Sequence, residues 1–222
     1  MERKDKSVIL SERIQYISNG ITYREQERNI KTALDAGISW IQLRWKENID
    51  QKELYKLAES CKLMCELNKS IFIINDHIQL AKHIDADGVH LGLQDASIKL
   101  AKQELGTNKI IGGTANSYED IIQRNCEECD YIGLGPLRFT KTKENLSPIL
   151  GIEGYHRLIS ELRTNQIKSV PIYAIGGVIE SDIRELIEAG IFGIAISSLI
   201  NRNPESIISI KNYYEKHIKN SG

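Results

Sequence analysis

The sequence contains no long apolar run. A helix that crosses a bilayer needs about 20 consecutive apolar residues, and no stretch of the 222-residue chain approaches that length. We therefore expect no membrane partner. The apolar residues 8–10 are too few for the core of a signal peptide, which predicts a flexible N-terminal leader over residues 1–11, a single domain over residues 12–222 and a cytoplasmic location.

An excess of charge of one sign is also missing. The chain has 29 Lys and Arg residues against 30 Asp and Glu residues, a net charge of −1. This balance gives no reason to expect a nucleic-acid partner. The hydrophobic share of 41% and the charged share of 27% are those of a soluble globular protein. We expect small-molecule substrates, and we leave homo-oligomer formation open.

Cysteine is scarce, and its spacing leaves two interpretations. Cys61 and Cys65 form a C-x₃-C pair, and Cys126 and Cys129 form a C-x₂-C pair, so a zinc site is one interpretation. However, Cys61 and Cys65 fall on the apolar stripe of a predicted helix, and a buried free cysteine behaves as a small hydrophobic residue. Disulfides are disfavoured in a reducing compartment. We favour core thiols.

The fold is read from a strand–helix alternation that repeats along the whole chain. Residues 71–74 and 88–91 are short, continuously apolar segments, which indicates strands buried on both faces, and the segment between them has helical spacing. Such units build parallel sheets. We expect eight strands, over residues 14–17, 40–43, 71–74, 88–91, 109–112, 131–136, 171–175 and 193–196.

Local signals mark where several of the intervening helices begin. Thr22 with Glu25 forms a capping box, and Asp50, Ser117 and Ser181 are expected to cap later helices. Alternation of this kind closes most naturally as a small (β/α)₈ TIM barrel, an α/β fold with a single domain. The competing architecture is an open doubly wound sheet, but no G-x-G-x-x-G motif follows the first strand.

Two carboxylates follow neighbouring strands. Asp76 comes directly after residues 71–74, and Asp95 comes shortly after residues 88–91. The carboxyl ends of parallel strands are where ligands bind in α/β folds. A buried carboxylate pair repels unless a cation lies between, and Mg²⁺ prefers one or two carboxylates together with phosphate oxygens. We expect Asp76 and Asp95 to hold Mg²⁺; the alternative for Asp76 is a helix cap.

Basic side chains at other strand ends would complete a diphosphate site. Arg44 and Lys46 leave the second strand on alternate positions and so share a face. Lys143 follows Thr140 and Thr142 in a polar loop. Arginine binds phosphate as a planar fork and lysine as a point charge. The alternative for the two lysines is solvated surface charge.

A second anion site is expected at the last two strand ends. Gly176 and Gly177 follow the seventh strand, and Ser197 and Ser198 follow the eighth. This is the common phosphate position of barrels; the alternative is a tight turn with a capping serine. One substrate held by its phosphate and another carrying a magnesium-bound diphosphate suggest a reaction that joins two organic parts and releases diphosphate.

At these residues the sequence resembles the thiamine-phosphate synthase (thiamine-phosphate pyrophosphorylase) family. Seven segments carry the resemblance, run in family order and cover nearly the whole chain. They are QLRWK at 42–46, IND at 74–76, ADGVHLG at 86–92, Asp95, GLGP at 133–136, TKTK at 140–143 and AIGG at 174–177.

The resemblance implies a (β/α)₈ barrel that couples a hydroxymethylpyrimidine diphosphate to a thiazole phosphate, giving thiamine phosphate and diphosphate by a dissociative route. It implies diphosphate contacts from Arg44, Lys46, Asn75 and Lys143, Mg²⁺ on Asp76 and Asp95, and pyrimidine contacts from Gln42 and Thr114. Thr140, Thr142, Gly177, Ser197 and Ser198 would hold the thiazole phosphate.

Three positions depart from the family pattern. Thr114 stands where the family more often has Ser, Asn116 where it more often has His, and Arg138-Phe139 where it more often has an uncharged aromatic–proline pair. Two rivals remain. A thiazole tautomerase on the same barrel would not need the diphosphate group and would be expected to rely on a histidine near position 116. A non-catalytic barrel could bind thiamine phosphates as a sensor.

Overall fold

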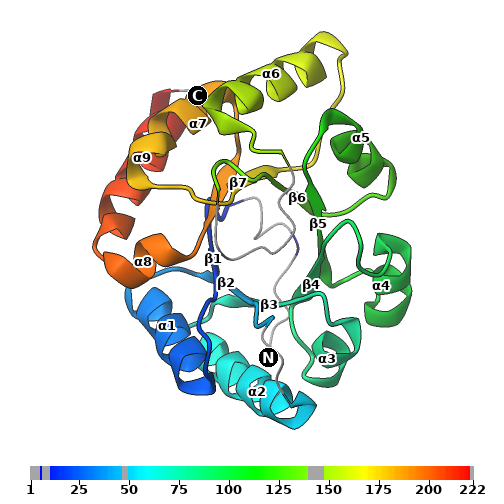
Figure 1. Cartoon of the computed structure of the whole chain (residues 1–222), viewed down its shortest axis with the longest axis vertical. Helices are drawn as coiled ribbons and strands as arrows, with labels where there is room; N and C mark the ends of the chain where they lie inside the picture. Colours follow the sequence, from blue (N-terminus) through cyan, green and yellow to red (C-terminus); the bar gives the residue numbers. More distant parts are fainter. Residues whose placement is uncertain (1–5, 7–10, 47–49, 140–147, 221–222) are drawn as a thin grey trace.

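Eight parallel strands form a closed barrel in chain order, and helices surround it (Figure 1). The computed structural model describes residues 6, 11–46, 50–139 and 148–220. The expected site residues Thr140, Thr142 and Lys143 lie outside them. The strands are β1 Ile14–Ile17, β2 Trp40–Leu43, β3 Ile71–Asn75, β4 Gly88–Leu91, β5 Ile110–Ala115, β6 Tyr131–Leu134, β7 Ile172–Ile175 and β8 Gly193–Ile196.

The barrel confirms the predicted fold class and excludes the open doubly wound sheet, because β8 pairs with β1. The helices are α1 Tyr23–Asp35, α2 Gln51–Leu67, α3 Ile78–His83, α4 Ile98–Leu105, α5 Tyr118–Cys126, α6 Gly151–Thr164, α7 Ile183–Ala189, α8 Ser198–Arg202 and α9 Ser206–Asn220, with a 3₁₀ turn η2 at Glu180–Asp182. Among the described residues, none of these helices has the length and apolar character needed to cross a membrane.

Most helix starts form as predicted. Thr22 closes a capping box with Glu25, Asp50 accepts from the Lys52 N–H, and Ser117 caps α5. Ser181 was wrongly predicted as a cap. It lies inside η2, and the side chain that accepts the backbone N–H there belongs to Asp182. A carboxylate competes well for this role, because an ionised acceptor forms the stronger hydrogen bond.

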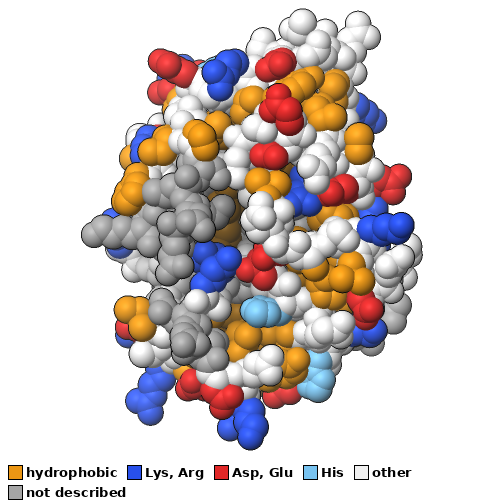
Figure 2. Space-filling view, turned by 45° about the vertical axis from the view of Figure 1, so that its right-hand side comes forward, with side chains coloured by type: hydrophobic (Ala, Val, Ile, Leu, Met, Phe, Trp, Pro, Cys, Tyr) orange, Lys and Arg blue, Asp and Glu red, His pale blue; other side chains and the backbone are white. Residues whose placement is uncertain are grey.

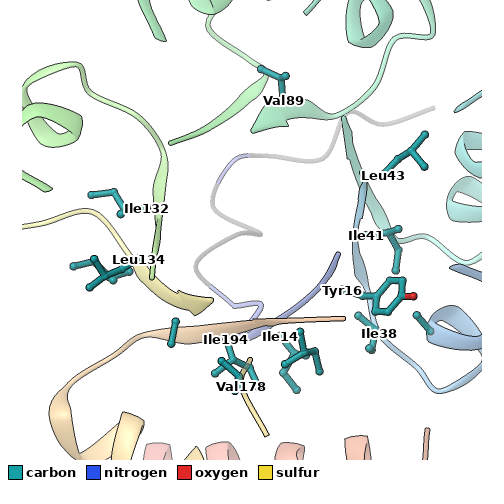
Figure 3. Packing of buried hydrophobic residues seen from close by; sticks show 14 of the residues in the cluster. Ile14, Tyr16, Ile38, Ile41, Leu43, Val89, Ile132, Leu134, Val178 and Ile194 are labelled. Carbon is teal, nitrogen blue, oxygen red and sulfur yellow. The ribbon is translucent and has the colours of Figure 1, made fainter. Parts of the chain in front are cut away.

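Apolar side chains fill two separate regions. The larger core lies between strands and helices, and Figure 3 shows members such as Leu43, Val89 and Leu134 on the outer side of the strand ring. A smaller cluster brings together Trp40, Tyr131 and Tyr173, whose rings meet edge to face with centroids 4.8–5.6 Å apart. Edge-to-face geometry is favourable for aromatic rings.

The cysteines mostly follow the favoured interpretation. Cys61, Cys65 and Cys129 are buried free thiols, while Cys126 is exposed. Burial raises the pKa of the Cys129 thiol to about 12, so it is protonated at neutral pH. Within the described part of the chain, no three His, Cys, Asp or Glu side chains form a group suited to a metal ion.

Candidate active site

Gln42, predicted to contact the pyrimidine, is hydrogen-bonded to Asn75, predicted to contact the diphosphate. They lie at the ends of neighbouring strands β2 and β3, and the Gln42 Nε2 donates to the Asn75 Oδ1 at 2.8 Å. Gln42 is only 1% exposed, and among the described residues its Oε1 has no hydrogen-bond partner. A buried acceptor without a partner is costly. This oxygen is therefore available to accept a hydrogen bond from a ligand.

The two predicted metal ligands come together at the ends of β3 and β4. Asp76 has a left-handed backbone (φ 64°), and its N–H donates to the His90 carbonyl at 2.8 Å. Its side chain is hydrogen-bonded to that of Asp95. The Lys46 Nζ lies 3.0 Å from the Asp76 Oδ2. Asp76 does not cap α3, because the N-cap residue is His77.

The carboxylate pair retains a proton more readily than ordinary aspartates. Burial raises the pKa of Asp76 to about 6, the hydrogen bond to Asp95 adds to this rise, and the charge of Lys46 opposes it. Burial also acts to raise the pKa of Asp95, but hydrogen bonds from Asp76 and from the Gly92 N–H, at 2.6 Å, hold it below its usual range. The hydrogen bond between the two carboxyls requires a proton, and a divalent cation can replace that proton.

Arg44 adds a second positive charge beside this pair. It is partly buried, and burial lowers the pKa of its guanidinium while the charge of Asp76 opposes that change. Its backbone N–H donates to the Ser18 Oγ at 2.9 Å, which fixes the start of the β2–α2 loop. Figure 2 shows basic and acidic side chains lying next to each other on one face of the molecule.

A hydrogen-bonded chain inside the barrel leads to Thr114. The His90 ring lies between two hydroxyls, with Nδ1 3.0 Å from the Tyr131 OH and Nε2 3.0 Å from the Thr114 Oγ1. The Gln15 Nε2 also donates to the Tyr131 OH at 3.2 Å. Sequence reasoning did not assign roles to Gln15, His90 or Tyr131. The only signal was a polar side chain within an apolar strand. Because these strands are buried on both faces, the sequence does not show which side chains point into the barrel.

The predicted second anion site lies at the ends of β7 and β8. Gly176 and Gly177 both have positive φ, 87° and 76°, and a Cβ on Gly176 would come within 2.7 Å of the Pro136 Cβ. Glycine is therefore required at Gly176. Ser197 precedes α8 and makes no side-chain cap, so the capping-serine alternative does not hold for it. Ser198 is exposed.

Arg138, noted only as a departure in the sequence, extends over this second site. Its guanidinium forms a two-pronged ion pair with Asp182 and donates from Nη1 to the Gly177 carbonyl at 3.0 Å. Asn116, another departure, donates from Nδ2 to the Gly135 carbonyl. It thus has a structural partner within the barrel mouth.

The structure therefore brings together the residues that were predicted to contact the metal, the diphosphate and the pyrimidine, as far as the structure describes them. Lys46, Asp76 and Asp95 form one charged group with Arg44 close by, and Gln42 with Asn75 lies beside it. Thr114 joins through His90. No described contact links this group to Gly176, Gly177, Ser197 or Ser198, which follow the ends of β7 and β8.

Comparisons with known proteins show which family the chain resembles. A family model described as "Thiamine monophosphate synthase" matches residues 15–200. A thiamine-phosphate synthase from Flavobacterium johnsoniae is 52% identical over 204 residues, covering 92% of this chain and 95% of the relative. One from Bacteroides fragilis is 40% identical over 198 residues, covering 89% of this chain and 96% of the relative.

A solved structure gives the same result. Thiamine phosphate pyrophosphorylase from Pyrococcus furiosus superposes with a TM-score of 0.76 at 25% identity, covering 92% of this chain and 96% of the other. The sequence-based identification is thereby confirmed. The chain belongs to the thiamine monophosphate synthase family and is an enzyme, a transferase of thiamine biosynthesis.

Proposed function

We propose that the protein couples 4-amino-2-methyl-5-(diphosphooxymethyl)pyrimidine to 4-methyl-5-(2-phosphooxyethyl)thiazole or its carboxylated form. The products are thiamine phosphate and diphosphate. The observation that carries the proposal is the Asp76–Asp95 pair with Lys46 at 3.0 Å, set beside the unpartnered oxygen of Gln42. The two carboxylates with Lys46 suit a metal-bound diphosphate, and the Gln42 oxygen suits a hydrogen-bond donor on the pyrimidine.

The side chains present fit Mg²⁺. Both Asp76 and Asp95 offer hard oxygen ligands, and a cation bound between them would take the place of the hydrogen bond that joins their side chains. Mg²⁺ usually takes only one or two carboxylates and fills its other positions with water and phosphate oxygens, so two aspartates suffice. When bound, the ion would supply positive charge to the departing diphosphate.

Arg44 and Lys46 would act on the same leaving group. In the described structure Lys46 neutralises Asp76, and a ligand oxygen entering between them would draw the ammonium toward itself. We assign Arg44, Lys46 and Lys143 to stabilising the diphosphate as its bond to the pyrimidine methylene breaks, with Asn75 as a further contact. Stabilising the charge that develops in a transition state is commonly the largest contribution to catalysis.

Gln42 and Thr114 would hold the pyrimidine. The hydrogen bond to Asn75 fixes the orientation of the Gln42 amide. Its Oε1, which has no partner among the described residues, can accept a hydrogen bond from the pyrimidine amino group. Thr114 is 8% exposed and its hydroxyl is oriented by His90. The reaction needs no protein nucleophile: the thiazole nitrogen would capture the methylene cation after diphosphate leaves.

The thiazole phosphate would bind at the ends of β7 and β8. Gly176 and Gly177 leave the backbone open to close approach, and Ser197 and Ser198 add hydroxyls and N–H groups on the adjacent strand end. Thr140 and Thr142 are assigned to the same phosphate. We further propose a cytoplasmic location, which suits a biosynthetic enzyme of small phosphorylated substrates.

Mixing the purified protein with both phosphorylated substrates and Mg²⁺ tests the proposal. We expect diphosphate and thiamine phosphate to appear in equal amounts. Conversion of the thiazole isomer alone would indicate the tautomerase, and binding without turnover would indicate the sensor.

Asp95→Ala should remove turnover and Mg²⁺ dependence together while the fold stays intact, and unchanged activity would refute the metal assignment. Lys143→Ala should lower kcat more than it raises KM for the thiazole phosphate.

A further inference from the structure

Arg138 connects two loops at the mouth of the barrel. It follows β6, the strand that pairs with β7 in the barrel (Figure 1). Its backbone N–H donates to the Gly176 carbonyl at 2.9 Å, and its guanidinium Nη1 donates to the Gly177 carbonyl at 3.0 Å. One residue thus binds both carbonyls of the glycine pair.

Asp182 fixes the other end of the guanidinium. It is 5% exposed, takes both prongs of the Arg138 fork, and accepts the Ile179 N–H at 2.9 Å. Arginine and a carboxylate form a planar, directional pair. The buried carboxylate also holds the turn 179–182 that leads into α7. Asp182 therefore fixes the Arg138 guanidinium against the same loop whose carbonyl it binds.

The bond to the Gly177 carbonyl also sets the direction of the next N–H. A trans peptide is planar, and its C=O and N–H point in opposite directions. Since the Gly177 carbonyl faces Arg138, the Val178 N–H points away from the guanidinium. Neither the Gly177 nor the Val178 N–H donates to an acceptor within the described residues. Two adjacent, unused N–H groups after positive-φ glycines are typical of an anion-binding turn.

We propose that Arg138 is a positioning residue for the phosphate of the second substrate. It holds the Gly177 carbonyl away from the ligand, anchored on Asp182, so that the Gly177 and Val178 N–H groups face the phosphate. The inference rests on the proposed function for the identity of that substrate. Arg138 itself does not touch the reacting atoms.

The decisive variant is Arg138→Met, which keeps the aliphatic stem and removes the fork. We expect KM for the thiazole phosphate to rise about tenfold, with kcat at saturation and KM for the pyrimidine diphosphate within about twofold. Arg138→Lys should rescue only part of this loss, because one ammonium cannot reproduce the fork. With the thiazole alcohol, which lacks the phosphate, wild type and Arg138→Met should have equal kcat/KM.

Arg184→Met is the matched control. Arg184 also pairs with a carboxylate, Glu188 at 2.8 Å, but it is exposed on α7 and bonds no carbonyl of the turn. It should leave both KM values unchanged. In the single variant the buried Asp182 carboxylate loses its ion-pair partner, and the double variant Arg138→Met/Asp182→Asn removes that carboxylate. It should recover the melting temperature but not the thiazole-phosphate KM.

Inorganic phosphate titrated against each variant gives a readout that does not need turnover. We expect about tenfold weaker binding in Arg138→Met and no change in Arg184→Met. Equal phosphate affinity in wild type and Arg138→Met would overturn the inference, as would recovery of KM in the double variant. If the wild type fails to join the two substrates but its phosphate affinity still depends on Arg138, the proposed function fails and the inference stands.

Discussion

Replacing Asp76 by Asn should stabilise the metal-free protein in a pH-dependent way. The pKa of Asp76 rises from 3.8 to about 6 on folding, with burial as the largest cause, and the side chain is only 19% exposed. The folded protein therefore binds this proton more tightly than the unfolded chain does. The contribution of Asp76 to the free energy of unfolding is greatest below about pH 4 and is lost as the pH rises through about 6.

The size of the effect follows from the same difference. About two pKa units at about 1.4 kcal/mol each give roughly 3 kcal/mol that the buried carboxylate costs at pH 7.5. Asn cannot ionise, and it tolerates the left-handed backbone at this position (φ 64°). Asp76→Asn should therefore gain about 3 kcal/mol over wild type between pH 4 and pH 7.5. Asp95 acts at lower pH, because its pKa lies below the usual range.

Urea unfolding in EDTA at several pH values measures this difference. Asp85→Asn is the matched control, since Asp85 also has positive φ (51°) but its side chain is 82% exposed and paired with Lys109. It should change stability by less than about 1 kcal/mol at every pH. A difference between Asp76→Asn and wild type that stays constant from pH 4 to pH 7.5 would refute the reasoning.

Three further outcomes are expected. In thermal scans above pH 6, added Mg²⁺ with diphosphate should raise the melting temperature of wild type but not that of Asp76→Asn. An equal rise in melting temperature for both proteins would contradict the metal assignment. Lys46→Met should lower kcat about tenfold to a hundredfold, and steady-state kinetics with unchanged kcat would remove Lys46 from the diphosphate site. Thr114→Ser should keep KM for the pyrimidine diphosphate, whereas Thr114→Val should raise it about tenfold; equal values would exclude a role for the hydroxyl.

The fold was predictable because its signals are local. Short, continuous apolar segments such as 71–74 indicate buried strands, and caps such as Asp50 act within a few residues. The meeting of Asp76 and Asp95 also followed from the sequence, since consecutive strands in a barrel are neighbours. That inference needed only chain order and the rule that strand ends gather at one mouth.

What could not be predicted depends on partners distant in the chain. His90 bonds to Thr114 and Tyr131 because all three point inward from β4, β5 and β6, and a strand buried on both faces does not reveal its inward side. The pairing of Arg138 with Asp182, 44 residues later, has no local pattern either. Sequence order places such residues on the right loops but not in contact.

A crystal structure with Mg²⁺ and diphosphate tests the central claim most directly. We predict one metal ion with carboxylate oxygens of both Asp76 and Asp95 at about 2.1 Å, and with Lys46 moved from Asp76 to a diphosphate oxygen. A structure in which the two carboxyls remain bonded to each other and to Lys46, with the ion elsewhere, would contradict it.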